Sequence, residues 1–125
     1  MRLRLTFVAA LAAGTVILAL PSFAGAMSHP KLTGVVGKNN AYKITLAGSN
    51  GKLVKTLKAG TYTFVIHDDS SIHSYSLDGP HGKSWTFTSV PFTGTKTVTL
   101  KLAPGAYKAY CAPHEAVMFQ NFNVS

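Results

Sequence analysis

Three side chains that bind transition metals lie close together near the C-terminus of this chain. Cys111, His114 and Met118 fall within eight residues, in a loop between the last two predicted strands. A second imidazole, His73, stands upstream at the start of another predicted strand. Two imidazoles, a thiolate and a weak thioether form the ligand set of a copper ion that changes its charge by one electron. The four residues therefore predict a mononuclear copper site.

The spacing of these residues is compatible with a single metal ion. Pro113 stiffens a tight turn between Cys111 and His114, so both side chains can point toward one atom. Met118 opens the final predicted strand and approaches from the side. His73 must come from a neighbouring strand, because two ligands three positions apart do not complete a coordination plane.

Alternative interpretations exist for each of these side chains. A lone cysteine is more often a small buried hydrophobic residue than a ligand, and Met118 has the same alternative in the core. Two other histidines compete with His73 for the ligand role. His67 stands at a strand end beside Asp68, which indicates a surface or hydrogen-bonded role, and His81 lies in a Gly/Pro loop.

The elements that must position these ligands are β-strands. Apolar and polar residues alternate with period two at 42–46, 61–66, 85–88, 97–102 and 107–111, and a last strand is expected near 119–124. Threonine, valine and aromatic residues suit half-buried strands, and no window after residue 26 has helical periodicity. Seven or eight short strands with Gly, Pro, Asn and Ser turns predict an all-β sandwich.

The first 26 residues predict a secretory signal peptide. Arg2 and Arg4 precede an uncharged, mostly apolar run of sixteen residues, and small residues at 24–26 provide a cleavage site. An uncleaved anchor is the alternative, although a spanning helix needs about 20 apolar residues. We therefore expect a cleavable signal peptide at 1–26 and one domain at 27–125. The mature chain would be periplasmic or extracellular, with no membrane span.

The composition argues against several function classes. The 125 residues carry a net charge of +8, but residues 27–125 contain ten lysines, four acidic residues and no arginine. Because arginine forks dominate base and phosphate recognition, nucleic-acid binding is not expected. The single cysteine excludes an intrachain disulfide. The Cys111–His114 pair has no evident Asn or Asp partner and no carboxylates are spaced as an acid–base pair, so we do not expect an enzyme.

In these residues the chain resembles the cupredoxins, the small blue copper proteins of the plastocyanin, pseudoazurin and amicyanin group. The resemblance covers nearly all of residues 41–125 and is carried by Leu57–Tyr62, Asp69–His73, Pro104–Tyr107 and Cys111–Met118. It implies a Greek-key β-sandwich, one type 1 copper ion, and ligand roles for His73, Cys111, His114 and Met118. Two positions depart from the family pattern. Ser74 stands where the family often has Asn, and Glu115 lies where the family commonly has an apolar edge.

A secondary Cu(II) site is expected at the mature N-terminus. Cleavage after Ala26 would leave Met27-Ser28-His29 as the first three residues. A free amine, two deprotonated amides and the imidazole of His29 form a square-planar chelate. Cleavage after Ala24 would abolish this site.

The sequence thus predicts a monomeric, exported carrier of single electrons. The exposed edge of His114 would admit electrons, and Lys83 and Lys108 would steer a redox partner with an acidic docking surface. The alternative is an exported copper-binding or copper-delivery protein with the same fold. A third possibility is a metal-free sandwich used for binding, with Cys111 merely buried.

Overall fold

The structure, a computed structural model, describes residues 16, 18, 19 and 28–125. Within them the chain forms nine strands and three short 3-10 turns. The strands are β1 (Lys31–Val36), β2 (Ile44–Ala47), β3 (Thr56–Leu57), β4 (Gly60–Asp68), β5 (Tyr75–Asp78), β6 (Ser84–Thr88), β7 (Gly94–Leu102), β8 (Gly105–Tyr110) and β9 (Phe119–Val124). The turns are η1 (Lys38–Asn40), η2 (Pro80–Gly82) and η3 (Ala112–His114). The predicted signal peptide, residues 1–26, lies almost entirely outside the described residues.

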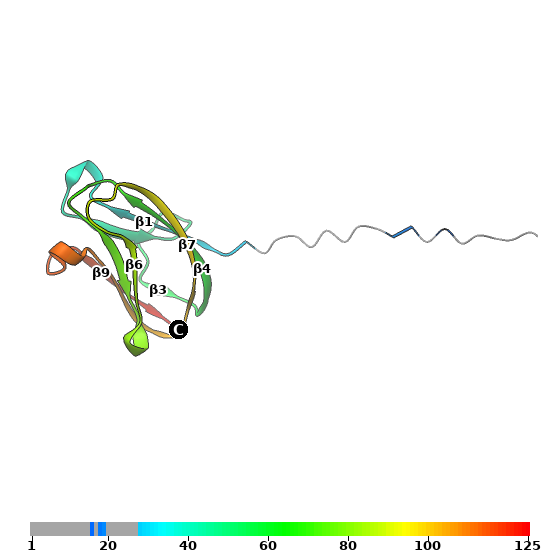
Figure 1. Cartoon of the computed structure of the whole chain (residues 1–125). Coiled ribbons are helices and arrows are strands. Elements are labelled where there is room, and N and C mark those ends of the chain that lie inside the picture. Colours follow the sequence, from blue (N-terminus) through cyan, green and yellow to red (C-terminus); the bar gives the residue numbers. More distant parts are fainter. Residues whose placement is uncertain (1–15, 17, 20–27) are drawn as a thin grey trace, which may run out of the picture.

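Two sheets face each other to form a sandwich (Figure 1). One sheet has the strand order β2-β1-β4-β7 and the other β3-β9-β8-β5-β6. Neighbours are antiparallel except β1–β4 and β3–β9, which are parallel. The predicted all-β fold is confirmed, but the strands number nine instead of seven or eight. Two strands are not predicted, because the alternation of apolar and polar residues does not reveal them. β3 has only two residues, and β1 carries Gly34 in its interior.

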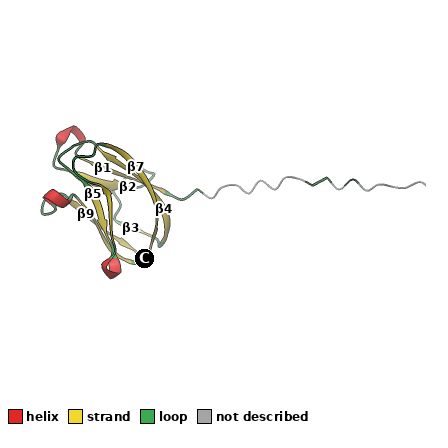
Figure 2. Ribbon diagram, in the orientation of Figure 1, coloured by secondary structure: helices red, strands yellow, loops and turns green. Residues whose placement is uncertain are grey.

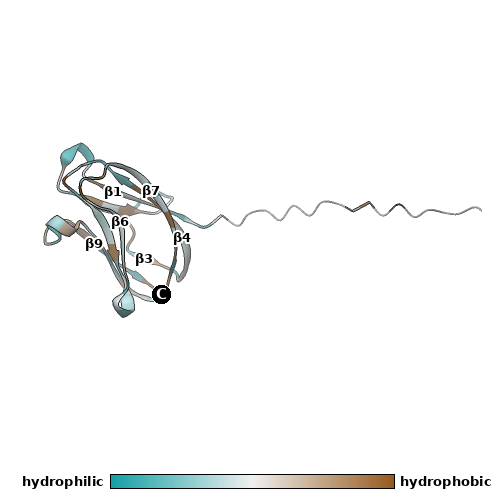
Figure 3. Ribbon diagram, in the orientation of Figure 1, coloured by the Kyte–Doolittle hydropathy of each residue, from teal (hydrophilic) through white to brown (hydrophobic). Residues whose placement is uncertain are grey.

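Buried apolar side chains fill the space between the sheets, while the turns at the ends are hydrophilic (Figure 3). Tyr75 of β5 crosses this core, and its hydroxyl donates a hydrogen bond of 2.9 Å to the Thr45 carbonyl of the opposite sheet. Gly34 of β1 makes room for the ring, because a Cβ at that position would lie 2.7 Å from the Tyr75 Cζ. This close approach explains why a glycine interrupts the β1 pattern.

The turns η1 and η3 lie at one end of the sandwich and η2 lies at the other (Figure 2). Strands β5 and β8 are antiparallel neighbours, with Ser76 opposite Tyr110. The residues that precede β5 therefore meet the residues that follow β8, at the end marked by η3. No helical segment of the described residues has the length and apolar character needed to cross a membrane.

Candidate metal centre

Cys111 and His114 are positioned by the loop that connects β8 to β9. Cys111 follows β8 directly, is fully buried, and its carbonyl accepts a hydrogen bond of 3.0 Å from the His114 amide. The His114 carbonyl in turn accepts the Met118 amide at 2.9 Å, and the Cys111 amide donates to the Met118 carbonyl at 3.0 Å. Backbone hydrogen bonds thus close the loop and fix the cysteine and the histidine relative to each other.

His73 reaches the same place from the segment that leads into β5. Its amide donates to the Ser70 carbonyl at 3.2 Å, and its side chain is fully buried. The pairing of β5 with β8 brings this segment against Cys111. The expectation that His73 comes from a neighbouring strand is therefore confirmed, with the strand itself beginning two residues later at Tyr75.

The donor atoms of these three residues converge. The Nδ1 atoms of His73 and His114 lie 3.2 Å apart, and the Cys111 Sγ lies 3.8 Å from the first and 3.6 Å from the second. Histidine, cysteine, aspartate and glutamate side chains can all bind a metal. Among the described residues, these three form the one group of such side chains whose donor atoms all lie within 4.8 Å of one another. Two imidazole nitrogens and a sulfur, with no carboxylate among them, fit a trigonal copper site.

The electrostatics of the cluster favour a neutral imidazole at His73. Burial lowers the pKa of His73 below its ordinary value of 6.5, the nearby His114 lowers it further, and Asp68 acts in the opposite direction. Asp68 is itself buried, where its carboxylate accepts hydrogen bonds from the Thr88 hydroxyl at 2.6 Å and the Ser70 amide at 3.2 Å. An unprotonated imidazole is the form that binds a metal.

Ser74 connects the two ligand-bearing segments. Its amide donates to the Cys111 Sγ at 3.4 Å, and its hydroxyl oxygen accepts the Ala112 amide at 3.1 Å. The serine that departs from the family pattern therefore makes a cross-loop hydrogen bond through its side chain.

Met118 lies in the same loop and is almost fully buried, with 1 % of its surface exposed. Its backbone groups take part in the loop hydrogen bonds to Cys111 and His114. A ligand role for its thioether remains a prediction.

The remaining histidines lie apart from the cluster. His67 is half-buried in β4, where its Nδ1 pairs with the Thr95 hydroxyl at 3.0 Å, in agreement with the hydrogen-bonded role expected for it. His81 is exposed in η2 at the opposite end of the sandwich (Figure 2). His29 is exposed before β1, and its proposed partner Met27 lies outside the described residues.

One residue of the site was not found by sequence reasoning. The alternation of residues 42–46 predicts that Tyr42 lies on a strand, but β2 begins at Ile44 and Tyr42 is 59 % exposed. Its ring contacts both imidazoles, with centroids 4.9 Å from His73 and 4.8 Å from His114. The signal that the strand starts later is the Asn39-Asn40 pair, whose residues both adopt positive φ in the η1 turn.

Comparison with known proteins adds evidence on the fold. No protein-family model and no curated protein matches the sequence. Among solved structures, a rusticyanin mutant aligns with a TM-score of 0.52 and 18% identity over 76% of this chain and 76% of that one. Auracyanin A, a "blue" copper protein from the green thermophilic photosynthetic bacterium Chloroflexus aurantiacus, aligns with a TM-score of 0.51 and 16% identity over 76% of this chain and 98% of its own. At these identities the likeness establishes the fold.

Proposed function

We propose that this chain, which has the cupredoxin fold, is an exported electron carrier that holds one copper ion between His73, Cys111 and His114. Met118 would supply a fourth, weaker ligand from the same loop. The observation that carries the proposal is the convergence of a buried sulfur and two Nδ1 atoms within 4.8 Å of one another.

Copper bound at this cluster would supply a one-electron couple between Cu(I) and Cu(II). The residues of the chain hold the donor atoms in place. Backbone hydrogen bonds close the Cys111–Met118 loop, and Ser74 links that loop to the segment that carries His73. Donors that are already in position need little rearrangement when the charge of the metal changes, which favours rapid electron exchange.

His114 is the point at which a redox partner would approach. It is partly exposed, whereas His73 and Cys111 are buried. Its neighbours Pro113 and Val117 are exposed and apolar and provide a contact surface for a partner protein, while the exposed Glu115 is paired with Lys108. Export and an acidic partner surface belong to the proposal. The basic and apolar N-terminal segment of the sequence supports export, and the surplus of lysines supports an acidic partner.

The proposal is tested by the visible and electron paramagnetic resonance spectra of the copper-loaded protein. We expect an intense blue or green colour from charge transfer between the cysteine sulfur and Cu(II). A one-electron reductant should bleach this colour reversibly, and Cys111→Ser should abolish it. His81→Gln, at the far end of the sandwich, is the matched control and should remain coloured. A wild-type protein whose Cu(II) complex is colourless would contradict the proposal.

The same preparation separates electron transfer from copper delivery. An electron carrier keeps its copper through repeated reduction and oxidation. Transfer of Cu(I) in one-to-one ratio to an acceptor apoprotein, without reversible redox cycling, would favour the delivery function instead.

A further inference from the structure

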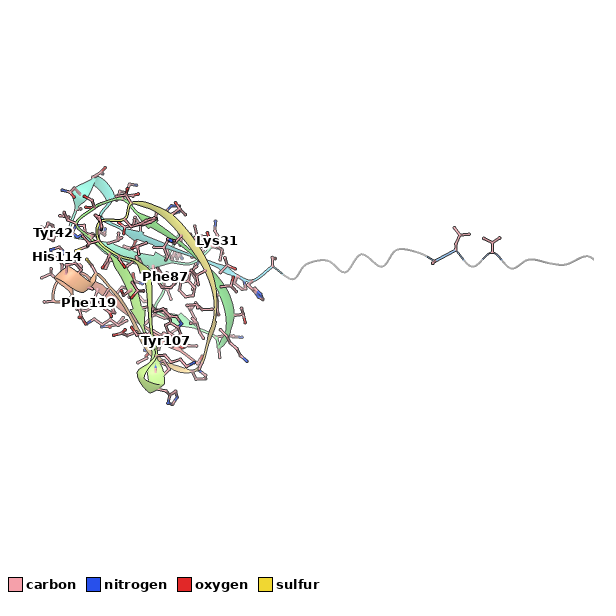
Figure 4. All side chains as sticks on the ribbon, viewed as in Figure 1. Lys31, Tyr42, Phe87, Tyr107, His114 and Phe119 are labelled. Carbon is pink, nitrogen blue, oxygen red and sulfur yellow. The ribbon has the colours of Figure 1, made fainter. Side chains whose placement is uncertain are left out.

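The segment that connects β1 to β2 lies on the two imidazoles of the cluster. Tyr42 and His114 appear side by side at the same end of the molecule (Figure 4). The planes of the Tyr42 ring and the two imidazoles are steeply inclined, at 79° to His73 and 71° to His114. The two imidazoles are themselves 5.0 Å apart at 74°. The three rings therefore form a mutual edge-to-face group, a favourable arrangement for aromatic side chains.

This segment, residues 37–42, is attached to the ligand-bearing segment at two further points. The Ser70 hydroxyl donates to the Asn40 side-chain oxygen at 2.7 Å. Gly37 packs so closely that a Cβ there would lie 2.5 Å from the Ser70 Cβ and 2.9 Å from the His73 Cδ2. Gly37 and Asn40 also have positive φ, at 70° and 59°, so the turn is shaped to bring the segment onto His73.

The exposure of Tyr42 shows that the ring is not a core residue. More than half of its surface, 59 %, faces solvent, and its described aromatic contacts are the two imidazoles. The ring therefore separates His73 and His114 from water on one side of the cluster. Because the anchored segment fixes the position of the ring, the ring in turn limits how far the imidazoles can rotate.

We infer that Tyr42 is a positioning residue that holds both imidazoles toward the cysteine sulfur and slows the loss of bound copper. This inference rests on the proposed function, because it assumes that copper occupies the cluster. The four ligands alone do not distinguish an electron carrier from a copper-delivery protein. A carrier must retain its copper between encounters, whereas a delivery protein must release it, so a residue that slows copper loss favours the carrier.

The first experiment measures the rate at which reduced, copper-loaded protein gives up Cu(I) to an excess of a coloured Cu(I) chelator. We expect Tyr42→Ala and Tyr42→Leu to release copper about tenfold faster than wild type, as lost aromatic contacts predict. Tyr42→Phe should release it at the wild-type rate, because the ring and not the hydroxyl makes the contact. Leu53→Ala is the matched control, since Leu53 is 55 % exposed and pairs with Ala47 at the far end of β2.

The second experiment needs no copper. In the metal-free protein, nuclear magnetic resonance of the imidazole carbon-bound protons should show shifted and broadened His73 and His114 signals in Tyr42→Ala and Tyr42→Leu. Tyr42→Phe and Leu53→Ala should leave these signals unchanged. A circular dichroism spectrum of each variant checks that the sandwich is folded.

The outcomes separate the two claims. A wild-type protein that binds no copper contradicts the proposed function, while the spectra of the metal-free variants still test whether Tyr42 holds the imidazoles. A wild-type protein that is blue, with Tyr42→Leu equal to it in both experiments, overturns the inference and leaves the proposed function intact. Faster release from Tyr42→Phe would also overturn it.

Discussion

Burial of His73 favours the neutral form of its imidazole, the form that binds a metal. The fully buried imidazole has a pKa below its ordinary value of 6.5, because burial and the neighbouring His114 both disfavour its charged form. Its Nε2 has no hydrogen-bond partner, and it is the one buried side-chain nitrogen or oxygen without a partner in the described part of the chain. The other ring nitrogen, Nδ1, faces the His114 Nδ1 and the Cys111 Sγ and is the atom that would bind the metal.

The lowered pKa predicts how the stability of the metal-free protein depends on pH. Above pH 6.5 the imidazole is neutral in both the folded and the unfolded chain, so the free energy of unfolding does not change with pH through this group. Below pH 6.5 the unfolded chain binds a proton more readily, and the free energy of unfolding should fall by up to about 1.4 kcal/mol per pH unit until the folded pKa is passed. Urea unfolding of the metal-free protein across this range measures the slope.

Two variants assign this slope to His73. His73→Gln should remove most of it, whereas His81→Gln, which changes an exposed residue at the other end of the sandwich, should retain it. Equal slopes in wild type and His73→Gln would show that another group is responsible.

The site illustrates what a sequence can predict at the scale of residues. Cys111 and His114 are found because a thiol and an imidazole separated by a proline-containing turn are close in any fold. His73 is found because the coordination plane needs an imidazole from a neighbouring strand and His73 stands at the start of one. The pairing of β5 with β8, which brings it to the loop, is seen only in the structure. Tyr42 is not found, because it alternates with Ile44 and so reads as a strand residue. Only the η1 turn, which the alternation does not predict, places its ring against the imidazoles.

The N-terminal chelate predicts a second copper equivalent. If processing follows Ala26, the amine of Met27 and the exposed imidazole of His29 would bind Cu(II) in a square-planar geometry that gives no blue colour. We expect titration to show two Cu(II) equivalents in wild type and one in His29→Ala, with the blue band unchanged. Mass spectrometry of the mature chain identifies its first residue. A chain that begins at Met27 and binds a single equivalent would contradict the prediction.

At the scale of elements, Gln120 of β9 connects the two sheets at their open side. Its Nε2 donates to the Leu46 and Val54 carbonyls, both at 2.9 Å, and its Oε1 accepts the Leu46 amide at 2.8 Å. Because β2 is at the edge of its sheet, these three bonds satisfy backbone groups near the end of the β2 ladder. One half-buried side chain thus joins β2 to the five-stranded sheet.

Replacing Gln120 should destabilise the whole sandwich. Gln120→Met keeps the length of the side chain but leaves the Leu46 amide and the Val54 carbonyl without this partner, while the Leu46 carbonyl keeps its bond of 2.9 Å from the Val54 amide. We therefore expect a loss of about 2–4 kcal/mol in the free energy of unfolding. Urea unfolding measures this loss, provided that the slope of the unfolding free energy against urea concentration is the same in wild type and variant. Asn121→Ala, at the exposed neighbouring position, should have an effect of less than about 0.5 kcal/mol. Similar losses in both variants would show that the cross-sheet bonds contribute little.

The strands differ in how well the sequence predicts them. Alternation marks β6, β7 and β8 because each of these strands has one face toward the core and one toward solvent. It fails for β1, where Gly34 replaces a side chain to accommodate the Tyr75 ring of the other sheet. That requirement arises from packing between strands far apart in the chain, so no local pattern contains it.

At the scale of the whole molecule, the two lysines predicted to steer a partner lie in different places. Lys83 follows η2, at the end away from the cluster. Lys108 is paired with Glu115 at 2.9 Å, the one salt bridge among the described residues, and its Nζ lies 5.0 Å from the Phe119 ring centroid. Sequence cannot tell which end of a sandwich a loop occupies. Lys38 and Lys43 are exposed in the segment that carries Tyr42 and, unlike Lys108, have no ion-pair partner among the described residues.

This arrangement predicts that electron transfer responds to salt in a direction set by the charge of the partner. Reduction of the copper protein by an anionic complex such as hexacyanoferrate(II) should slow by roughly three- to tenfold as ionic strength rises from about 10 mM to about 200 mM, because salt screens the attraction to the lysines. Oxidation of the reduced protein by a cationic cobalt complex should show the opposite trend. Stopped-flow absorbance of the blue band measures both rates.

The location of the relevant charge is tested by two matched double variants. Lys38→Gln with Lys43→Gln should flatten the salt dependence, because these side chains lie in the segment that carries Tyr42. Lys58→Gln with Lys101→Gln removes the same charge near Gly60 and Leu102, at the end of β4 and β7 away from the cluster, and should leave the dependence close to wild type. The separation between the ends of β4 exceeds the roughly 8–10 Å over which salt allows exposed charges to interact. Equal flattening in both variants would mean that net charge governs the encounter, and that the lysines beside Tyr42 have no special role.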